Sequence, residues 1–331
     1  MKQLLIDITG GKTLTRQQAH DVMLHIVEGR YNDVQISALL MGLAMRGIRT
    51  DELLGLRDGL LETGKRVDLQ GTPVIDIVGT GGDNKNTFNI STCACFIVAA
   101  AGYKVAKHGN YAATSTSGAS NVMEYHGVKF TSDISMLRRS LDACNIIYLH
   151  APLFAQGMKS VAPVRKMIQI PTCFNLLGPL VNPAHPQYQL LGTANLNQLR
   201  LYSSVNEKIG INYGILTSID GYDEISLTGD FKVKTNYFEK VFKPADFGFA
   251  KVNSEELYGG KTVDEAAHIF DDILNNRSTE SRKNVVLANA AMAIKVIEKD
   301  KDIAHCVAVA REALESGRAY NCLKKFVELN S

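Results

Sequence analysis

Residues 74–83 read Val74-Ile-Asp-Ile-Val-Gly-Thr-Gly-Gly-Asp83, a short apolar run followed directly by a glycine-rich turn and a carboxylate. The β-branched residues of this run predict a buried strand at 74–78. Three glycines among the next four residues let the backbone approach a ligand closely and point its N–H groups toward an anion. The combination indicates an α/β domain with an anion site, although a plain strand-to-helix turn has the same composition.

Further strands and helices alternate after this turn. Ser91 opens an apolar helix that runs to about Gly102. Strand-like runs lie at 103–107, 145–149, 213–219 and 224–228, and helical patterns at 267–274, 285–298 and 303–316. This alternation predicts βαβ units, and therefore a mainly parallel central sheet flanked by helices.

The first seventy residues show helical patterns only. Thr15 and Gln18 have capping-box spacing, Asn32 is a second N-cap candidate, and Thr50 precedes a third amphipathic stretch that Gly64 would end. Three short helices bury little surface alone, so they must pack against the rest of the chain or a second subunit. We expect a helical domain at 1–72, joined by a helical segment around 162–185, and an α/β domain at 73–331.

Composition and charge exclude several classes of protein. The 36 basic and 34 acidic residues give a net charge of +2, without the basic excess of a nucleic-acid binder. No apolar run approaches the roughly 20 residues that cross a bilayer, and the first residues do not form a secretory signal. The six cysteines lack C-x-x-C spacing and are expected to be reduced thiols. We therefore expect a cytoplasmic protein with no nucleic-acid and no membrane partner.

The start of the apolar helix is a second candidate anion site. Ser91 and Thr92 are suited to be ordinary N-caps, but a helix N-terminus also offers free N–H groups to a pyrophosphate. Asp83 would repel a bare phosphate unless a metal or a sugar hydroxyl lay between them. Together the two turns predict a site for a phosphorylated sugar with bound magnesium.

The segment Lys107-His-Gly-Asn110 follows the next predicted strand. Lys107 would supply positive charge to a phosphate, Gly109 would allow close approach, and Asn110 would bind a small polar substrate. His108 is equally consistent with a packed residue and with a reactive one. The hydroxyl-rich stretch 114–118 continues the loop.

Two further segments carry charged side chains at informative places. Asp223 and Glu224 follow the strand at 213–219, where α/β proteins bind ligands, so they are candidate magnesium ligands as well as ordinary solvated acids. Arg165 precedes a turn stiffened by glycine and proline, Phe174-Asn-Leu-Leu-Gly-Pro179. Its guanidinium would hold a carboxylate in a bidentate fork, or lie on a surface helix.

Taken in order, these segments closely resemble the anthranilate phosphoribosyltransferase family. The motifs are GTGGD, NIST, KHGN, APVRK, FNLLGPLVNP, QLLG and DGYDEISLTG, and the resemblance runs from the N-terminal helices to near residue 300. It implies a helical domain beside a larger nucleoside phosphorylase-like α/β domain, and a homodimer formed through the helical domain. It also implies transfer of the 5-phosphoribosyl group of PRPP to the amine of anthranilate, a step of tryptophan biosynthesis.

The resemblance also implies the site residues. Anthranilate would contact Gly79, Asn110 and Arg165. Two magnesium ions per subunit would be held by Ser91, Asp223 and Glu224, and the catalytic set would be Asp83, Lys107, Asp223 and Glu224. PRPP would be bound by Gly79, Gly82, Asp83, Thr87, Asn89, Ile90, Ser91, Thr92, Lys107, His108, Gly109, Asn110, Thr114, Ser115 and Ala119.

The chain departs from the family mainly on the acceptor side. Most members have phenylalanine–histidine–proline where this chain reads Phe154-Ala-Gln156, and that histidine lies along the acceptor's route. His150 lies five residues earlier. Members also often have glycine, arginine, serine and aspartate where this chain has Asn84, Tyr111, Ala119 and Asn121.

Two other functions fit parts of the pattern. Pyrimidine nucleoside phosphorylases share the layout but carry lysine–histidine–serine where this chain has Lys107-His-Gly109. A paralogue that binds nucleic acid or a protein partner would show a clustered basic groove. The Asp223–Glu224 pair and Arg165 favour the transferase.

Overall fold

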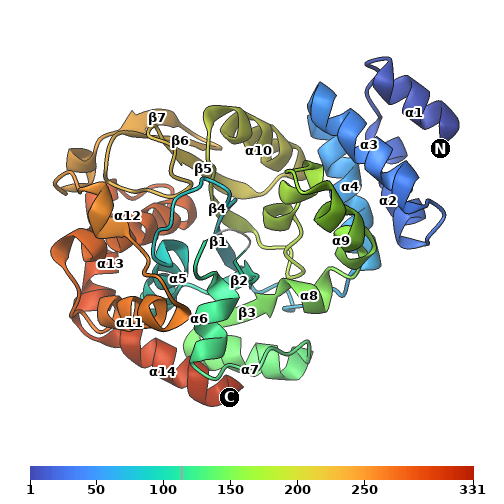
Figure 1. Cartoon of the computed structure of the whole chain (residues 1–331). Helices are drawn as coiled ribbons and strands as arrows, with labels where there is room; N and C mark the ends of the chain where they lie inside the picture. Colours follow the sequence, from blue (N-terminus) through green and yellow to red (C-terminus); the bar gives the residue numbers. More distant parts are fainter. Residues whose placement is uncertain (113–114) are drawn as a thin grey trace. The chain divides into compact units, whose positions relative to one another are not determined.

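The structure is a computed structural model that describes residues 1–112 and 115–331. Its contacts divide the chain into two compact units. Unit 1 comprises Met1–Val67 and Ala151–His185, and unit 2 comprises Asp68–His150 and Pro186–Ser331. Unit 1 is helical, whereas unit 2 contains a sheet flanked by helices (Figure 1). The domain limits given above, 1–72 and 73–331, remain a prediction.

The capping boxes predicted at Thr15 and Asn32 open two helices of unit 1. The helix α4 begins at Thr50 itself, with Arg49 as its N-cap, and its C-cap Gly64 is extended rather than left-handed. The first helix was not predicted, because Ile8 is its one buried residue. The elements of unit 1 are α1 (Lys2–Thr9), α2 (Arg16–Val27), α3 (Asp33–Arg46), α4 (Thr50–Thr63), α8 (Ala151–Phe154), α9 (Gly157–Ile168) and the 3-10 turns η1 (Cys173–Asn175) and η2 (Gly178–Leu180).

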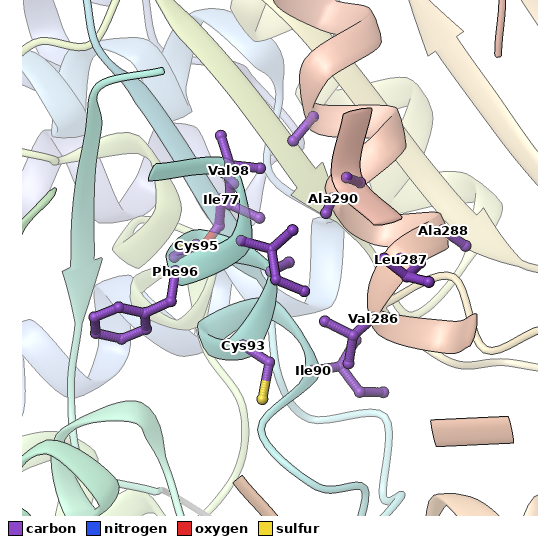
Figure 2. Close-up of a cluster of buried hydrophobic side chains, with 14 of the residues drawn as sticks. Ile77, Ile90, Cys93, Cys95, Phe96, Val98, Val286, Leu287, Ala288 and Ala290 are labelled. Atoms are coloured by element: carbon purple, nitrogen blue, oxygen red, sulfur yellow. Dashed lines mark hydrogen bonds between the residues drawn. The ribbon is translucent and has the colours of Figure 1, made fainter. Parts of the chain in front are cut away.

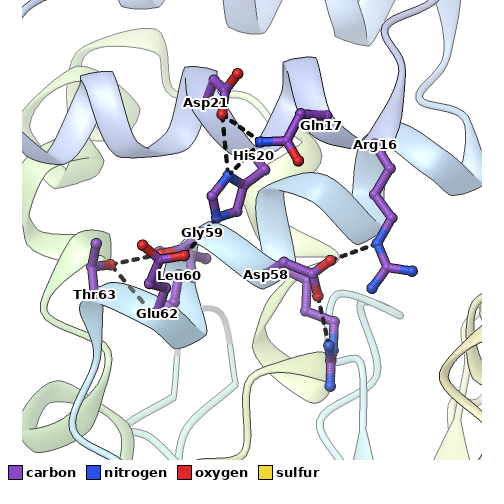
Figure 3. Close-up of polar contacts among 10 residues, drawn as sticks. Arg16, Gln17, His20, Asp21, Asp58, Gly59, Leu60, Glu62 and Thr63 are labelled. Carbon is purple, nitrogen blue, oxygen red and sulfur yellow. Dashed lines mark hydrogen bonds and ion pairs between the residues drawn. The ribbon is translucent and has the colours of Figure 1, made fainter.

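Helices α2 and α4 pack closely because α4 carries glycines on the shared face. A Cβ atom at Gly55 would lie 2.1 Å from the carbonyl oxygen of Arg16. Polar pairs border this contact (Figure 3): Arg16 Nε lies 2.6 Å from Asp58 Oδ2, and His20 Nε2 lies 2.8 Å from Glu62 Oε2. The helices are therefore held by close backbone contact in the middle and by ion pairs at the rim.

Unit 2 is built on one seven-stranded sheet with the order β3-β2-β1-β4-β5-β6-β7. The first five strands in this order are parallel, and β6 and β7 add antiparallel pairs at the edge. The predicted mainly parallel sheet is thus confirmed. The strands are β1 (Ile75–Gly79), β2 (Val105–Gly109), β3 (Ile146–His150), β4 (Tyr188–Gly192), β5 (Asn212–Ser218), β6 (Phe231–Thr235) and β7 (Glu239–Phe242).

The strand predicted at 224–228 is wrong, because these residues form a loop. The sequence analysis also missed β4, β6 and β7, as well as α7, α10 and α14. The helical elements of unit 2 are α5 (Ile90–Ala100), α6 (Ala119–Tyr125), α7 (Ile134–Cys144), α10 (Leu196–Ile209), η3 (Pro244–Phe247), η4 (Ser254–Leu257), α11 (Val263–Leu274), α12 (Glu280–Ile297), α13 (Ile303–Glu315) and α14 (Arg318–Asn330).

Helix α5 is the centre of the core of unit 2. It packs on β1, β2 and β3, and α12, α13 and α14 pack against it (Figure 1). Cys93, Cys95 and Phe96 of α5 and Val286 of α12 are almost completely buried (Figure 2). Because α5 is apolar on all sides, packing fixes its N-terminus firmly beside the end of β1.

All six cysteines are free thiols, and only Cys322 is partly exposed. In the part of the chain that the structure describes, no helix combines the length and the apolar character needed to cross a bilayer.

Candidate active site

The five parallel strands of unit 2 end at one edge of the sheet. The register pairs Gly79 at the end of β1 with Gly192 at the end of β4, and Gly109 at the end of β2 with His150 at the end of β3. The glycine-rich turn, the loop after Lys107 and the loop with Asp223 therefore all begin at this edge. This is the edge at which parallel α/β sheets bind ligands.

The glycine-rich turn needs its glycines. Gly81 and Gly82 have φ angles of +68° and +75°, in the left-handed region that L side chains rarely adopt. The Gly81 N–H donates to Asp223 Oδ2 at 2.6 Å, and the Thr80 N–H donates to the carbonyl of Gly192 at 2.9 Å. A Cβ atom at Gly79 would lie 2.4 Å from the same Asp223 oxygen. The turn is thus folded against the acidic loop.

The predicted acidic residues lie together beside the start of α5. Glu224 Oε1 accepts a hydrogen bond from the Ser91 N–H at 2.9 Å, and Asp83 Oδ2 lies 3.5 Å from the Asp223 nitrogen. Asp223 and Glu224 are thereby brought to Asp83 and Ser91, which lie 140 and 133 positions earlier in the sequence.

Burial and mutual repulsion dominate the electrostatics of this acidic group. Burial and then the charge of Asp83 raise the pKa of Asp223, and burial and then the charge of Asp223 raise the pKa of Glu224. The site is thus short of positive charge, which is what a bound cation would supply. Within residues 1–112 and 115–331, no group of three or more His, Cys, Asp or Glu side chains is arranged to hold a metal.

Lys107 and His108 both lie inside the protein. The Lys107 side chain is 2% exposed, and its ammonium donates to the carbonyl of Ile77 at 2.8 Å. Its positive charge lowers the pKa of Glu224, against the larger effect of burial. The His108 N–H donates to Asp76 Oδ1 at 3.2 Å, and the residue is 5% exposed. Of the two alternatives for His108, its environment is therefore that of a packed residue.

Two buried polar atoms near the glycine-rich turn and α5 have no partner among the described residues. They are Thr80 Oγ1 and Asn89 Oδ1. The Asn89 amide nitrogen donates to the carbonyl of Ser117 at 3.2 Å. Because unpaired buried polar atoms are costly, these two oxygens are suited to accept from water or from hydroxyls of a sugar.

The comparisons with known proteins agree with this geometry. The α/β domain of a glycosyl transferase family matches residues 71–320, and the helical bundle domain of a glycosyl transferase family matches residues 2–64. The chain is 57% identical to the anthranilate phosphoribosyltransferase of Phocaeicola vulgatus and 55% identical to that of Bacteroides thetaiotaomicron, with all of each chain covered. This chain belongs to the anthranilate phosphoribosyltransferase family.

Solved members of the anthranilate phosphoribosyltransferase family have the same fold. The Thermus thermophilus enzyme matches with a TM-score of 0.93 and 30% identity, covering 98% of each chain. The Saccharomyces cerevisiae enzyme, solved in complex with PRPP and Mg, matches with a TM-score of 0.90 and 26% identity over 99% of this chain and 98% of that one. The fold class predicted from the sequence is thereby confirmed.

The loop after β2 and the first turn of α6 contain several departures from the family. Asn121, where aspartate is frequent in anthranilate phosphoribosyltransferases, accepts from the N–H groups of Ala112 at 3.1 Å and Gly118 at 3.0 Å. Asn121 thus ties the two sides of the loop together through a neutral amide oxygen. Ser115 and Ala119 are partly buried, whereas Thr114, predicted to bind PRPP, lies outside the described residues.

The other predicted residues lie in three environments. Ile90 and Thr92 are buried in the first turn of α5, and Thr87 forms an isolated bridge with Tyr258. Arg165 belongs to the last turn of α9 in unit 1, where burial lowers its pKa. Ala155, which replaces the histidine of most family members, lines a small cavity of unit 1 with Leu60, Leu61, Gly64, Lys65, Arg66, Phe154, Val181, Pro183 and His185.

The sequence analysis missed two residues that hold the acidic loop. Asn289 of α12 accepts from the Ile225 N–H at 3.1 Å and donates to the Ile225 carbonyl at 2.8 Å. Ser218 Oγ donates to the carbonyl of Glu224 at 2.7 Å. The one signal for Asn289 was a lone amide within the apolar run Val285–Ile294.

Proposed function

We propose that this chain transfers the 5-phosphoribosyl group of PRPP to the amine of anthranilate. The products are N-(5-phosphoribosyl)anthranilate and pyrophosphate, and the reaction is a step of tryptophan biosynthesis. Identity of 57% over the full length to a curated anthranilate phosphoribosyltransferase supports the assignment. The observation that carries it in the structure is the contact of Glu224 with the first turn of α5.

We assign PRPP to the edge of the sheet formed by the ends of β1 and β2 and the start of α5. The turn at 79–83, the segment 87–92, and residues 107–112 and 115–119 would surround the diphosphate and the ribose. Backbone N–H groups and the positive end of the α5 dipole favour phosphate at this place. The unpaired oxygens of Thr80 and Asn89 would accept from ribose hydroxyls.

Magnesium fits the acidic group, because Asp223 and Glu224 are carboxylates with raised pKa and little compensating charge. The yeast relative was solved with PRPP and Mg. We propose that Ser91, Asp223 and Glu224 hold two ions per subunit together with substrate phosphates, since magnesium prefers one or two carboxylates plus phosphates. Bound magnesium would neutralise the charge of the diphosphate.

In the proposed mechanism the protein aligns the two substrates and stabilises charge. Loss of pyrophosphate leaves positive charge on the anomeric carbon, and the anthranilate amine attacks with inversion. The aniline nitrogen is neutral near pH 7, so no strong base is needed before attack. As the C–N bond forms and the anomeric C–O bond to pyrophosphate breaks, the nitrogen loses a proton to pyrophosphate or to solvent. Asn110 and Gly79 would contact the acceptor, and Arg165 would bind its carboxylate. Positioning of this kind is worth about 7–11 kcal/mol, and fixed dipoles add to it.

Lys107 has an indirect part in this proposal. Its ammonium is buried and bonded to the Ile77 carbonyl, so it supplies positive charge from behind the acidic group. Asp83, whose Oδ2 lies 3.5 Å from the Asp223 nitrogen, would complete the polar edge of the PRPP site.

We also propose a cytoplasmic homodimer that forms through unit 1. The helices of unit 1 carry exposed apolar side chains, with Val34 78% and Met45 86% exposed on α3 and Met167 62% exposed on α9. Such side chains favour a contact with a second copy. Analytical ultracentrifugation of the wild type and of Met45→Glu tests this: the wild type should sediment as a dimer and the variant should dissociate more readily.

The function is tested by incubating the purified protein with magnesium, PRPP and anthranilate. Anthranilate fluorescence should fall with time, and it should stay constant when PRPP is omitted or EDTA is added. The protein contains no tryptophan, so its own emission interferes little. A constant signal in the complete mixture, or phosphorolysis of a pyrimidine nucleoside instead, would overturn the proposal.

A further inference from the structure

A buried polar cluster lies under the loop that follows β2, outside the acidic group. Ser120 Oγ, at the second residue of α6, lies 2.7 Å from the hydroxyl of Tyr148 and 2.9 Å from Nδ1 of His150. Ser120 is completely buried, and the two β3 residues are about 5% and 6% exposed. One serine hydroxyl therefore joins two side chains of the neighbouring strand.

The cluster contacts the main chain at Gly109, the last residue of β2, and at Asn110, the residue that follows. The Ser120 N–H donates to the carbonyl of Asn110 at 3.1 Å. A Cβ atom at Gly109 would lie 2.2 Å from the Tyr148 hydroxyl, so this hydroxyl sits directly against the glycine backbone. The positions of Gly109 and Asn110 thus depend on Ser120 and Tyr148.

Aromatic rings fix the orientation of His150. The Phe130 ring stacks on it with centroids 4.2 Å apart and an interplanar angle of 15°, and the Tyr111 ring meets it edge-on at 5.1 Å. The Tyr111 hydroxyl donates to Glu124 at 3.1 Å. Burial lowers the pKa of His150, against the charge of Glu124, which favours the neutral form of the ring that bonds to Ser120.

A hydrogen bond from the next residue orients the Asn110 side chain. Asn110 Oδ1 accepts from the Tyr111 N–H at 2.8 Å, and Asn110 itself is exposed. Because its oxygen is engaged, the Asn110 amide offers mainly its N–H groups, which have no hydrogen-bond partner among the described residues. These are the groups that a carboxylate or another acceptor atom of a small substrate would use.

We propose that Ser120, Tyr148 and His150 are positioning residues that hold Asn110 in place for anthranilate. This inference rests on the proposed function and extends it to residues that are not assigned to either substrate. A network that merely packed β3 against α6 would affect stability alone. A positioning network also sets the requirement for the acceptor, because small displacements of a binding group lower rates strongly.

Kinetics of Ser120→Ala and His150→Phe test the proposal, since the first keeps the helix and the second keeps the aromatic stack. Both should raise KM for anthranilate by about tenfold and KM for PRPP by a clearly smaller factor, because Asn110 is assigned to both substrates and Gly109 to PRPP. His150→Asn places an amide near the former Nδ1, so it should recover part of the loss seen with His150→Phe. Tyr148→Phe is the second variant if Ser120→Ala does not fold.

His126→Phe is the matched control. His126 is also largely buried, bonds through both ring nitrogens to the Val122 carbonyl and Asp271, and packs edge-on against Phe270. This variant should lower Tm and leave both KM values unchanged.

The outcomes separate the two proposals. Equal rises of both KM values in the Ser120 and His150 variants, or a lower Tm with unchanged kinetics, would overturn the positioning role alone. A wild type that fails to consume anthranilate, measured first, would overturn the proposed function and this inference with it.

Discussion

The carboxylate of Glu224 accepts a hydrogen bond of 2.9 Å from the backbone N–H of Ser91. The contact joins the loop after β5 to the first turn of α5, across 133 positions of the sequence. The positive end of the helix dipole offsets part of the cost of placing a second carboxylate beside Asp223. The acidic group is therefore held by the same helix start that we assign to the diphosphate.

Neutralising both acids should separate activity from stability. In Asp223→Asn with Glu224→Gln, we expect turnover to fall by at least about 10²-fold, because the charge that holds magnesium is lost. The Tm should be equal or higher, since burial and repulsion already oppose ionisation of both groups. Fluorescence assays and thermal unfolding measure the two effects. Full activity in the double variant would reject the metal assignment.

Gly192 at the end of β4 has no room for a side chain. A Cβ atom there would lie 1.6 Å from the carbonyl oxygen of Asp223. Gly192→Ala should therefore displace the acidic loop, lower activity strongly and cost about 1–3 kcal/mol of the free energy of unfolding. The control is Gly229→Ala in the same loop, where the nearest atom would lie at an ordinary 3.4 Å. Equal activity and equal stability of Gly192→Ala and Gly229→Ala would contradict the argument from close packing at Gly192.

Asn289 should be essential for the shape of the acidic loop. Asn289→Leu keeps the approximate size but removes the hydrogen bonds to both backbone groups of Ile225. Stranding buried backbone groups costs about 1–3 kcal/mol each, so unfolding in urea should show a loss of at least about 2 kcal/mol. The magnesium concentration needed for activity should rise as well.

Asn284→Leu on the same helix is the control for Asn289→Leu. The Oδ1 atom of Asn284 is buried and finds no partner in the residues that the structure describes. Its removal should therefore change the free energy of unfolding little. If Asn289→Leu were no less stable than this control, the hydrogen bonds between Asn289 and Ile225 would not contribute to the stability of the loop.

The sequence predicted the acidic site because a general rule applies to it. Parallel strands end at one edge of a sheet, so Asp83 after β1 and Glu224 after β5 had to approach one another. The local pattern failed at 224–228, where a strand-like run predicted a strand and the structure has a loop that contains Ile225 and Leu227. Both side chains are buried, but Leu227 has a φ angle of +57°. The backbone N–H groups of Ser226 and Thr228 donate to the side-chain oxygens of Ser218 and Ser226, not to backbone carbonyls of a neighbouring strand.

Other features could not be predicted, because they depend on partners far away in the sequence. Nothing in the order Lys107-His-Gly indicates that the ammonium turns inward to the carbonyl of Ile77. Ser120 finds its partners on β3, 28 and 30 residues away, and Asn289 bonds to Ile225 at a separation of 64. Periodicity shows which side chains are buried, whereas these contacts also require the register between elements.

Arg165 should affect the binding of anthranilate and not that of PRPP. If its guanidinium binds the carboxylate of anthranilate, Arg165→Ala should raise KM for anthranilate by about 10²-fold and change KM for PRPP little. Lys166→Ala is the matched control, because Lys166 is the next residue on α9 and is exposed. Steady-state kinetics with each substrate varied in turn measure the difference. Equal effects on the two KM values would contradict the assigned role.

His126 should make the stability of unit 2 depend on pH. Burial opposes its charged form, but hydrogen bonds to Asp271 and to the Val122 carbonyl outweigh burial, so the pKa of folded His126 is above its ordinary value of 6.5. The protonated ring is therefore favoured in the folded state. Its contribution is fully present below about pH 6.5 and is lost as the pH rises through the higher folded value.

Urea unfolding of the wild type and of His126→Phe between about pH 5.5 and pH 8.5 measures this contribution. The free energy of unfolding of the wild type should exceed that of the variant most at the acid end. This difference should shrink toward the alkaline end. The loss of ring packing against Phe270 is independent of pH, so it adds a constant offset and no slope. A difference that stayed constant with pH would show that the imidazole acts through packing, and that the pair with Asp271 adds nothing to folding.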